Sequence, residues 1–140
     1  TSIEPMSGNP TATHLSVYYN NVRGMTGKKD QILLSTTSTD YDTIVMSETW
    51  LNHDKFSAEF FDIRYTVYRK DRQDSNIAAV QGGGVLIAVD SKHDSEAVLF
   101  PELEPLEAVF VKVTMNFEVE ADALCLLLFV WSMTRLLLPE

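Results

Sequence analysis

The sequence predicts one mixed domain of the α/β (α+β) class, in which at least six strands and one helix build a mixed or antiparallel sheet structure. The chain of 140 residues is 45% hydrophobic and 22% charged, which is the composition of an ordinary globular domain. Short runs rich in β-branched, aromatic or alternating apolar residues predict the strands. One segment with an apolar centre and charged flanks predicts the helix.

The first part of the chain predicts a lead-in, a strand and a helix. Residues 1–13 combine proline, glycine, serine and threonine without periodicity, so we expect a disordered lead-in. A strand is predicted from Leu15 to Val22, directly before the turn signal Arg23-Gly24. Residues 28–38 predict a short helix whose C-terminal half is weak, because serine and threonine compete for backbone hydrogen bonds.

The central part predicts three strands. Thr43–Ser47 is a short apolar run, typical of a strand covered on both faces, and Tyr65–Arg69 has the alternation of a strand. A polar loop follows from Lys70 to Gln81. Gly82-Gly83-Gly84 then leads into the buried strand Val85–Val89, and these glycines indicate a flexible or closely approached backbone.

The last part predicts two neighbouring strands. After a hairpin-like loop, Glu107–Val113 alternates cleanly, and Ala123–Val130 is predicted to pair with it across the acidic turn Glu118–Asp122. The apolar stretch Ala123–Leu138 is shorter than the roughly 20 residues that cross a bilayer. We therefore expect a buried strand pair or a badly matched terminus there, and no membrane partner.

The net charge of the whole chain disfavours nucleic acid as a partner, but the distribution of the charge along the chain weakens this argument. A net charge of −9 argues against nucleic acid, because phosphate binding depends on clustered lysine and arginine. Residues 1–75, however, carry eight basic and ten acidic side chains, whereas residues 76–140 carry three and ten. Nucleic acid is therefore not excluded for the first half. The single cysteine, Cys125, excludes an internal disulfide framework and a cysteine-rich zinc site.

Two polar residues at predicted strand exits are candidates for a metal site. Glu48 directly follows a buried strand, where a carboxylate can bind a hard cation such as Mg²⁺ or Mn²⁺. The alternative is a solvated loop acid or a capping residue. Asn21 ends the first strand, where its amide can bind a phosphate oxygen or a metal-bound water. The alternative is an ordinary turn residue.

A basic stretch with interleaved aromatic residues lies between Arg64 and Arg72. Its four cations face one acid, Asp71, and Tyr65 and Tyr68 lie among them. This pattern suits phosphate groups and stacked bases. The alternative is a charged edge strand, since charge protects a sheet edge from pairing.

Other chemistries find no support in the sequence. His14, His53 and His93 lack metal-ligand spacing and are predicted as surface or loop residues. No serine has a histidine partner at a recognisable spacing, so covalent serine catalysis is unsupported. Gly82-Gly83-Gly84 is not a phosphate loop, because no Gly-Lys-Ser/Thr follows and the run enters a strand.

Four blocks in order resemble the endonuclease/exonuclease/phosphatase family, and more narrowly the apurinic-type endonuclease domain of non-LTR (LINE-like) retrotransposons. The resemblance covers roughly Leu15–Val113, the amino-terminal half of such a domain. The blocks are Tyr19–Gly24, Tyr41–Leu51, Tyr68–Arg72 and Gly82–Ile87.

The resemblance implies a fold and a function. The fold is a four-layered β-sandwich of the endonuclease/exonuclease/phosphatase type, truncated here to residues 14–140 with a divergent tail at 123–140. The function is that of a Mg²⁺-dependent (or Mn²⁺-dependent) endonuclease that nicks target DNA, intracellular and, as part of a functional retrotransposon protein, nuclear. By position, Glu48 and Asn21 match the family's catalytic and metal-binding residues. We expect the basic loop to contact DNA through Arg69, Lys70 and Arg72.

Part of the family's catalytic set finds no matching position. This holds for its central Asp-x-Asn pair, its later aspartate and its carboxy-terminal Asp-His pair, so we expect the chain to be inactive, or nearly so, on its own. Two alternatives stay open. The chain could be a non-catalytic remnant that binds other proteins through its apolar tail, or a phosphatase or phosphodiesterase of the same superfamily that acts on lipids or inositol phosphates.

Overall fold

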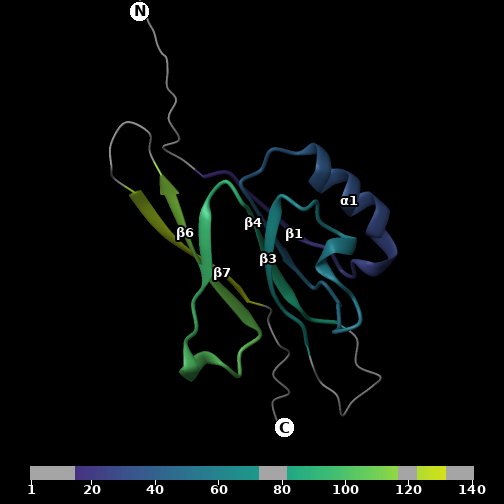
Figure 1. Cartoon of the computed structure of the whole chain (residues 1–140). Helices are drawn as coiled ribbons and strands as arrows, with labels where there is room; N and C mark the ends of the chain where they lie inside the picture. The colour runs from purple at the N-terminus through teal and green to yellow at the C-terminus, as the bar shows by residue number, and fades with distance from the viewer. Residues whose placement is uncertain (1–14, 73–81, 117–122, 132–140) are drawn as a thin grey trace, which may run out of the picture.

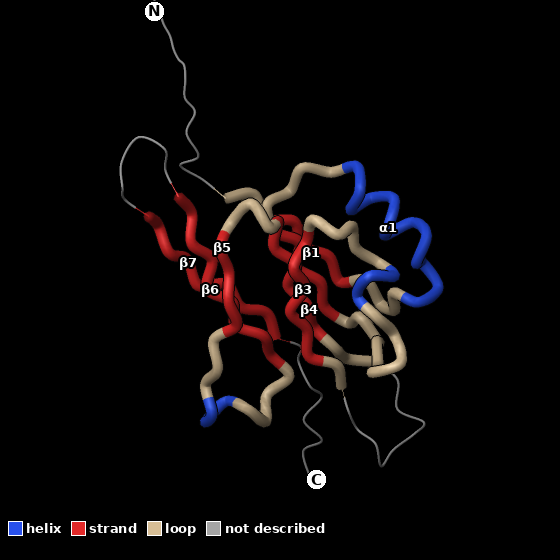
Figure 2. The backbone as a smooth tube through the Cα atoms, viewed as in Figure 1, coloured by secondary structure: helices blue, strands red, loops and turns tan. Residues whose placement is uncertain are grey.

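The computed structural model describes residues 15–72, 82–116 and 123–131, which form two β-sheets and one α-helix (Figures 1 and 2). The predicted mixed α+β class is confirmed. The lead-in at 1–13, the acidic turn at 118–122 and His14 lie outside the described residues.

The first sheet has four strands in the order β1-β2-β4-β3. β1 and β2 run parallel, whereas β4 is antiparallel to both β2 and β3. As a result, the C-terminal ends of three strands and the start of the fourth meet at one edge of the sheet. The strands are β1 (Val17–Asn21), β2 (Thr43–Ser47), β3 (Tyr65–Lys70) and β4 (Val85–Asp90).

The second sheet has three antiparallel strands, in the order β5-β6-β7. The predicted pairing of the last two strands is confirmed, since Ala108–Asn116 (β6) pairs with Ala123–Trp131 (β7). The predicted hairpin-like loop was wrong in part, because Asp94–Ala97 within it forms β5 and pairs with β6. Its polar, largely exposed residues carry no apolar alternation, so this strand exists through its pairing alone.

The helix α1 (Lys29–Ser38) connects β1 to the parallel β2, as a parallel crossover requires. Its buried positions are Ile32 and Thr36, which lie four residues apart on one helix face, whereas Leu34 is 69% exposed. The Thr36 hydroxyl lies 3.2 Å from the Phe60 carbonyl oxygen and donates to it, so a polar residue is satisfied inside the core. Three 3₁₀ turns complete the helical elements of the described chain: Thr26–Lys28, Ser57–Glu59 and Pro101–Leu103.

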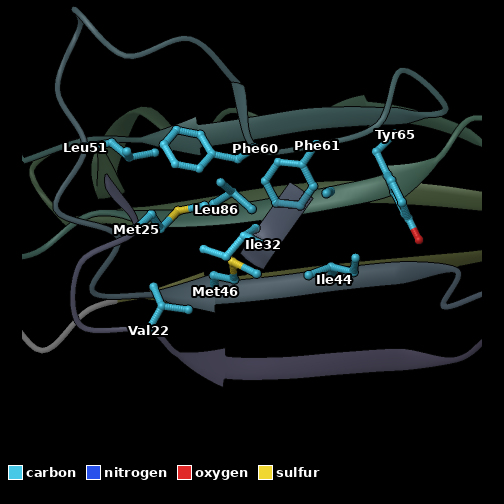
Figure 3. Close-up of a cluster of buried hydrophobic side chains, with 11 residues drawn as sticks. Val22, Met25, Ile32, Ile44, Met46, Leu51, Phe60, Phe61, Tyr65 and Leu86 are labelled. Carbon is cyan, nitrogen blue, oxygen red and sulfur yellow. The ribbon is translucent and has the colours of Figure 1, made fainter. Parts of the chain in front are cut away.

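The helix α1, the first sheet and the second sheet form three layers, and two apolar clusters hold these layers together. The first lies between α1 and the first sheet and includes the aromatic residues Phe60, Phe61 and Tyr65 (Figure 3). The second joins the two sheets face to face through valines and one isoleucine. The central strand β2 is buried at all five positions, as predicted for Thr43–Ser47. The second cluster consists of Val45, Val85, Ile87, Val89, Val109, Val111, Val113 and Val130.

No helix in the described ranges is long and apolar enough to cross a membrane. The first part of the apolar stretch Ala123–Leu138 forms β7.

The edge of the first sheet that lies opposite Glu48 carries an ion cluster in which Asp42 and His93 are largely buried and Lys92 is exposed. One carboxylate oxygen of Asp42 accepts hydrogen bonds from the backbone and the hydroxyl of Ser16 at 2.9 and 3.1 Å. The other lies 3.1 Å from His93 Nε2 and 3.2 Å from Lys92 Nζ. Burial alone would raise the pKa of Asp42, but the hydrogen bonds from Ser16, His93 and Lys92 outweigh it and lower the pKa from 3.8 to about 2.

This depressed pKa predicts an acid-sensitive contribution to stability. The contribution is fully present above the unfolded-state pKa of 3.8 and is lost as the pH falls towards about 2. Asp42→Asn should therefore lower the free energy of unfolding at neutral pH by about 1–2 kcal/mol, and the difference from wild type should disappear near the folded-state pKa.

Urea denaturation across this pH range measures the effect. Asp94→Asn, at an exposed position of β5, is the matched control and should unfold as the wild type does. Equal stability of Asp42→Asn and wild type at neutral pH would contradict the prediction.

Candidate functional site

Four segments of the chain meet at one edge of the first sheet. Asn21, the last residue of β1, is in register with Ser47, the last residue of β2. Lys70, at the end of β3, is in register with Val85, at the start of β4. The loops that follow β1 and β2 and the glycine run that precedes β4 therefore lie side by side, and Glu48 lies in the middle one.

The loop after β2 is bonded to both neighbouring loops. On one side, the carbonyl of Glu48 accepts a hydrogen bond from Gly24 N at 2.9 Å. On the other side, Trp50 N donates to the carbonyl of Gly83 at 2.8 Å. These bonds continue the ladder of the sheet beyond the strands, so the backbone around Glu48 is fixed from both directions.

Every positive φ angle among the described residues occurs in these three loops. A residue other than glycine in this region is held there at a cost of roughly 1–3 kcal/mol, and such residues concentrate at functional sites. The conformation therefore marks this edge as the candidate site. The residues are Arg23 (50°), Glu48 (56°), Trp50 (58°), Gly24 (97°), Gly82 (114°), Gly83 (77°) and Gly84 (97°).

The Glu48 carboxylate is half-buried and oriented by two donors. Its Oε1 accepts a hydrogen bond from the Trp50 indole Nε1 at 2.9 Å and one from the backbone Gly83 N at 3.2 Å. A carboxylate held by an indole and a backbone amide has a defined orientation. A solvated loop acid, which was the alternative interpretation of Glu48, would not need one.

Arg72 brings a fixed cation to the same place. Its guanidinium forms a two-point pair with the buried Glu107, with N–O distances of 3.0 and 3.1 Å. The glycine run allows this approach, because a Cβ on Gly83 would overlap the guanidinium. A Cβ built on Gly82 would lie 3.6 Å from Arg72 Nη1 and 3.7 Å from Glu48 Oε1, so both side chains reach the backbone of Gly82.

A hollow of about 610 Å³ adjoins this cluster. Three cationic residues and the half-exposed Trp50 ring line it, and its described lining contains no acidic side chain. Cationic, polar and glycine-rich walls of this kind suit an anionic group such as phosphate. The lining residues are Arg23, Gly24, Thr26, Gly27, Lys28, Trp50, Leu51, Asn52, Arg72 and Gly82.

The structure brings some of the predicted site residues together. Arg72 and Glu48 both lie next to Gly82. Asn21 is exposed at the end of β1, on the strand next to the one that Glu48 follows, but it lines another hollow, beside α1, and not the one that Arg72 lines.

Arg69 and Lys70 instead point to opposite faces of β3, as successive strand residues do. The Arg69 guanidinium bonds to the carbonyls of Asn52 and Lys55. The ammonium of Lys70 bonds to the carbonyl oxygens of Glu104 at 2.5 Å and Leu106 at 2.7 Å. DNA contact by Arg69, Lys70 and Arg72 stays a prediction.

The two further cations and the aromatic residue of the hollow, Arg23, Lys28 and Trp50, were not proposed as site residues from the sequence. Lys28 Nζ lies 2.5 Å from the Val22 carbonyl oxygen, so it closes the loop after β1. The available signal was the tryptophan two residues after the candidate metal ligand and the Arg-Gly turn after the first strand. Neither pattern reveals that the two loops lie side by side.

Histidine is not part of this site in the described chain. His53 is exposed next to Asp54, and His93 is a partner of Asp42 at the other end of the sheet. The prediction that both lie in loops is confirmed, although His93 is nearly buried.

The donor set fits a hard cation that also binds substrate. The Glu48 carboxylate and the Asn21 amide offer oxygen ligands at neighbouring strand ends, and Mg²⁺ commonly uses one or two carboxylates together with substrate phosphates. Within the described ranges, no group of three or more His, Cys, Asp or Glu residues could hold an ion by itself.

Comparison with known protein families finds no matching family model, and comparison with curated proteins finds no matching relative.

The close approach at the glycine run predicts a large effect of one added methyl group. At Gly84, where φ is 97°, a Cβ would overlap the hydroxyl of the fully buried Thr49. Gly84→Ala should lower the free energy of unfolding by about 2–3 kcal/mol, because the left-handed backbone and the overlap both disfavour alanine.

Gly27→Ala is the control, because a Cβ there meets nothing within 4 Å and should change stability by less than about 1 kcal/mol. Both values come from urea denaturation. Similar stabilities of the two variants would contradict the packing described for the glycine run.

Proposed function

We propose that this edge of the sheet is the metal- and phosphate-binding part of a Mg²⁺-dependent or Mn²⁺-dependent DNA endonuclease site. In this proposal the two packed sheets belong to a four-layered sandwich of the endonuclease/exonuclease/phosphatase type. The main support is the orientation of Glu48 by Trp50 and Gly83 beside a hollow lined by three cations. The site type also agrees with the resemblance of the four sequence blocks.

The residues have separate roles in this proposal. Glu48 provides the anionic oxygens for the cation, and the Asn21 amide orients the phosphate or a water molecule near it. A bound cation polarises the phosphodiester and offsets the charge that develops on its oxygens. Arg72, fixed by Glu107, adds positive charge at a defined position, which favours a phosphate over a neutral ligand.

We further propose that the 140-residue chain does not cleave DNA efficiently by itself. Hydrolysis needs a group that activates water, and the described lining of the hollow contains no carboxylate or imidazole for this role. The proposed function of these residues is therefore to bind the cation and the phosphate.

Cation binding in the presence of DNA tests the proposal directly. Mn²⁺ binding is measured by electron paramagnetic resonance with a short DNA duplex present, for the wild type and for Glu48→Gln. The amide keeps an oxygen that accepts from Trp50 but loses the charge, so the affinity for Mn²⁺ should fall at least about tenfold. Glu96→Gln, at an exposed position of β5, is the control and should bind as the wild type does. Equal Mn²⁺ affinity of Glu48→Gln and wild type would refute the proposal.

A nicking assay tests the second part. The purified chain, incubated with supercoiled plasmid and Mg²⁺, should leave the plasmid as intact as a reaction without protein does. Robust nicking that Glu48→Gln abolishes would show that the chain is a complete endonuclease and would overturn the proposed inactivity.

A further inference from the structure

Trp50 occupies a position that its own surroundings do not explain. The side chain is 41% exposed, although burying an indole is normally favourable. Its backbone has a φ of 58°, which is costly for a bulky residue. An exposed aromatic ring that is maintained at such a cost points to a contact made outside the folded chain.

The ring is nevertheless held in one orientation. Its Nε1 donates to Glu48 Oε1 at 2.9 Å, and its six-membered ring lies against the backbone of Gly24. A Cβ on Gly24 would lie 2.6 Å from the ring atom Cε3, so only glycine permits this contact. A ring fixed in this way loses little conformational entropy when a ligand stacks on it.

The charges around the ring identify the kind of ligand. Arg23, Lys28 and Arg72 line the same hollow as Trp50. Within the described part of the chain, the Arg23 guanidinium has no hydrogen bond or ion pair, and it is exposed. Cations next to an aromatic face suit a ligand that has both phosphates and a flat ring. The volume of about 610 Å³ lies within the range of roughly 300–1,000 Å³ typical of small-molecule sites.

We propose that Trp50 stacks on an unpaired nucleobase of a DNA strand and that Arg23 and Lys28 bind the phosphates on either side of that nucleotide. This inference rests on the proposed function, because it specifies which form of DNA binds at the same edge of the sheet. A base inside a duplex is stacked on both faces and is not available to an indole, so the site selects single-stranded or locally opened DNA.

The test uses the full chain in EDTA, so that no metal contributes. Fluorescence anisotropy measures the binding of a labelled oligothymidylate about eight nucleotides long and of a duplex of the same length. Trp50→Ala should weaken single-strand binding about tenfold and leave duplex binding nearly unchanged. Trp50→Phe, which keeps an aromatic face, should retain most of the single-strand affinity.

Tryptophan emission gives a second readout. The oligothymidylate should quench the emission of the wild type, and most of this quenching should be absent in Trp50→Phe, whose remaining tryptophan is Trp131. Circular dichroism establishes that each variant is folded. Wild-type single-strand affinity in a folded Trp50→Ala variant would overturn the inference, as would an equal loss for single strand and duplex.

Charge variants separate the contributions of phosphate and base. Arg23→Gln should weaken single strand and duplex alike, because a phosphate contact does not distinguish them. Lys29→Gln removes a charge that lies outside the hollow and should change neither affinity.

Glu48→Gln distinguishes this inference from the proposed function. If it abolishes Mn²⁺ binding while Trp50→Ala has no effect on oligonucleotide binding, only the stacking inference fails. If it leaves Mn²⁺ binding unchanged while Trp50→Ala weakens oligonucleotide binding, only the metal site fails.

Discussion

The hydrogen-bonding of β2 and of the loop after it is the constraint on which the rest of the site depends. β2 is buried at every position and pairs with β1 on one side and β4 on the other. The pairing continues past the strand, where Glu48 and Trp50 stay bonded to both neighbouring loops. Because these bonds hold the backbone in left-handed conformations, the carboxylate and the indole project from a rigid edge.

The glycine run before β4 makes this arrangement possible. Glycine at 83 leaves room for the guanidinium of Arg72, and glycine at 84 leaves room for the buried Thr49. Arg72 is in turn held by Glu107, which directly precedes β6 of the second sheet. The packing of the two sheets thereby positions the Arg72 guanidinium at the edge of the first sheet. An acidic residue from the acidic half of the chain supports the proposed phosphate-binding surface in this way.

Local sequence patterns predicted most of the fold. Thr43–Ser47 and Val85–Val89 are continuous apolar runs, and such a run by itself predicts a strand that is covered on both faces. Both form central strands of the first sheet. The two strands of the last third were paired correctly because their apolar residues and the acidic segment between them define a hairpin. β5 was missed, since Asp94–Ala97 has no apolar period and becomes a strand only by bonding to β6.

The sequence by itself therefore determined the class of the fold, the positions of most strands along the chain and the position of Glu48 and Asn21 at strand exits, because these depend on residues that are near in the chain. Only the tertiary structure decided which side chains meet at that edge. Arg23, Trp50 and Arg72 come from the loops after β1, β2 and β3, and only the pairing of these strands with one another and with β4 brings them around one hollow. The formation of β3 as far as Lys70 separates Arg69 and Lys70, neighbours in the sequence, because a strand turns successive side chains to opposite faces.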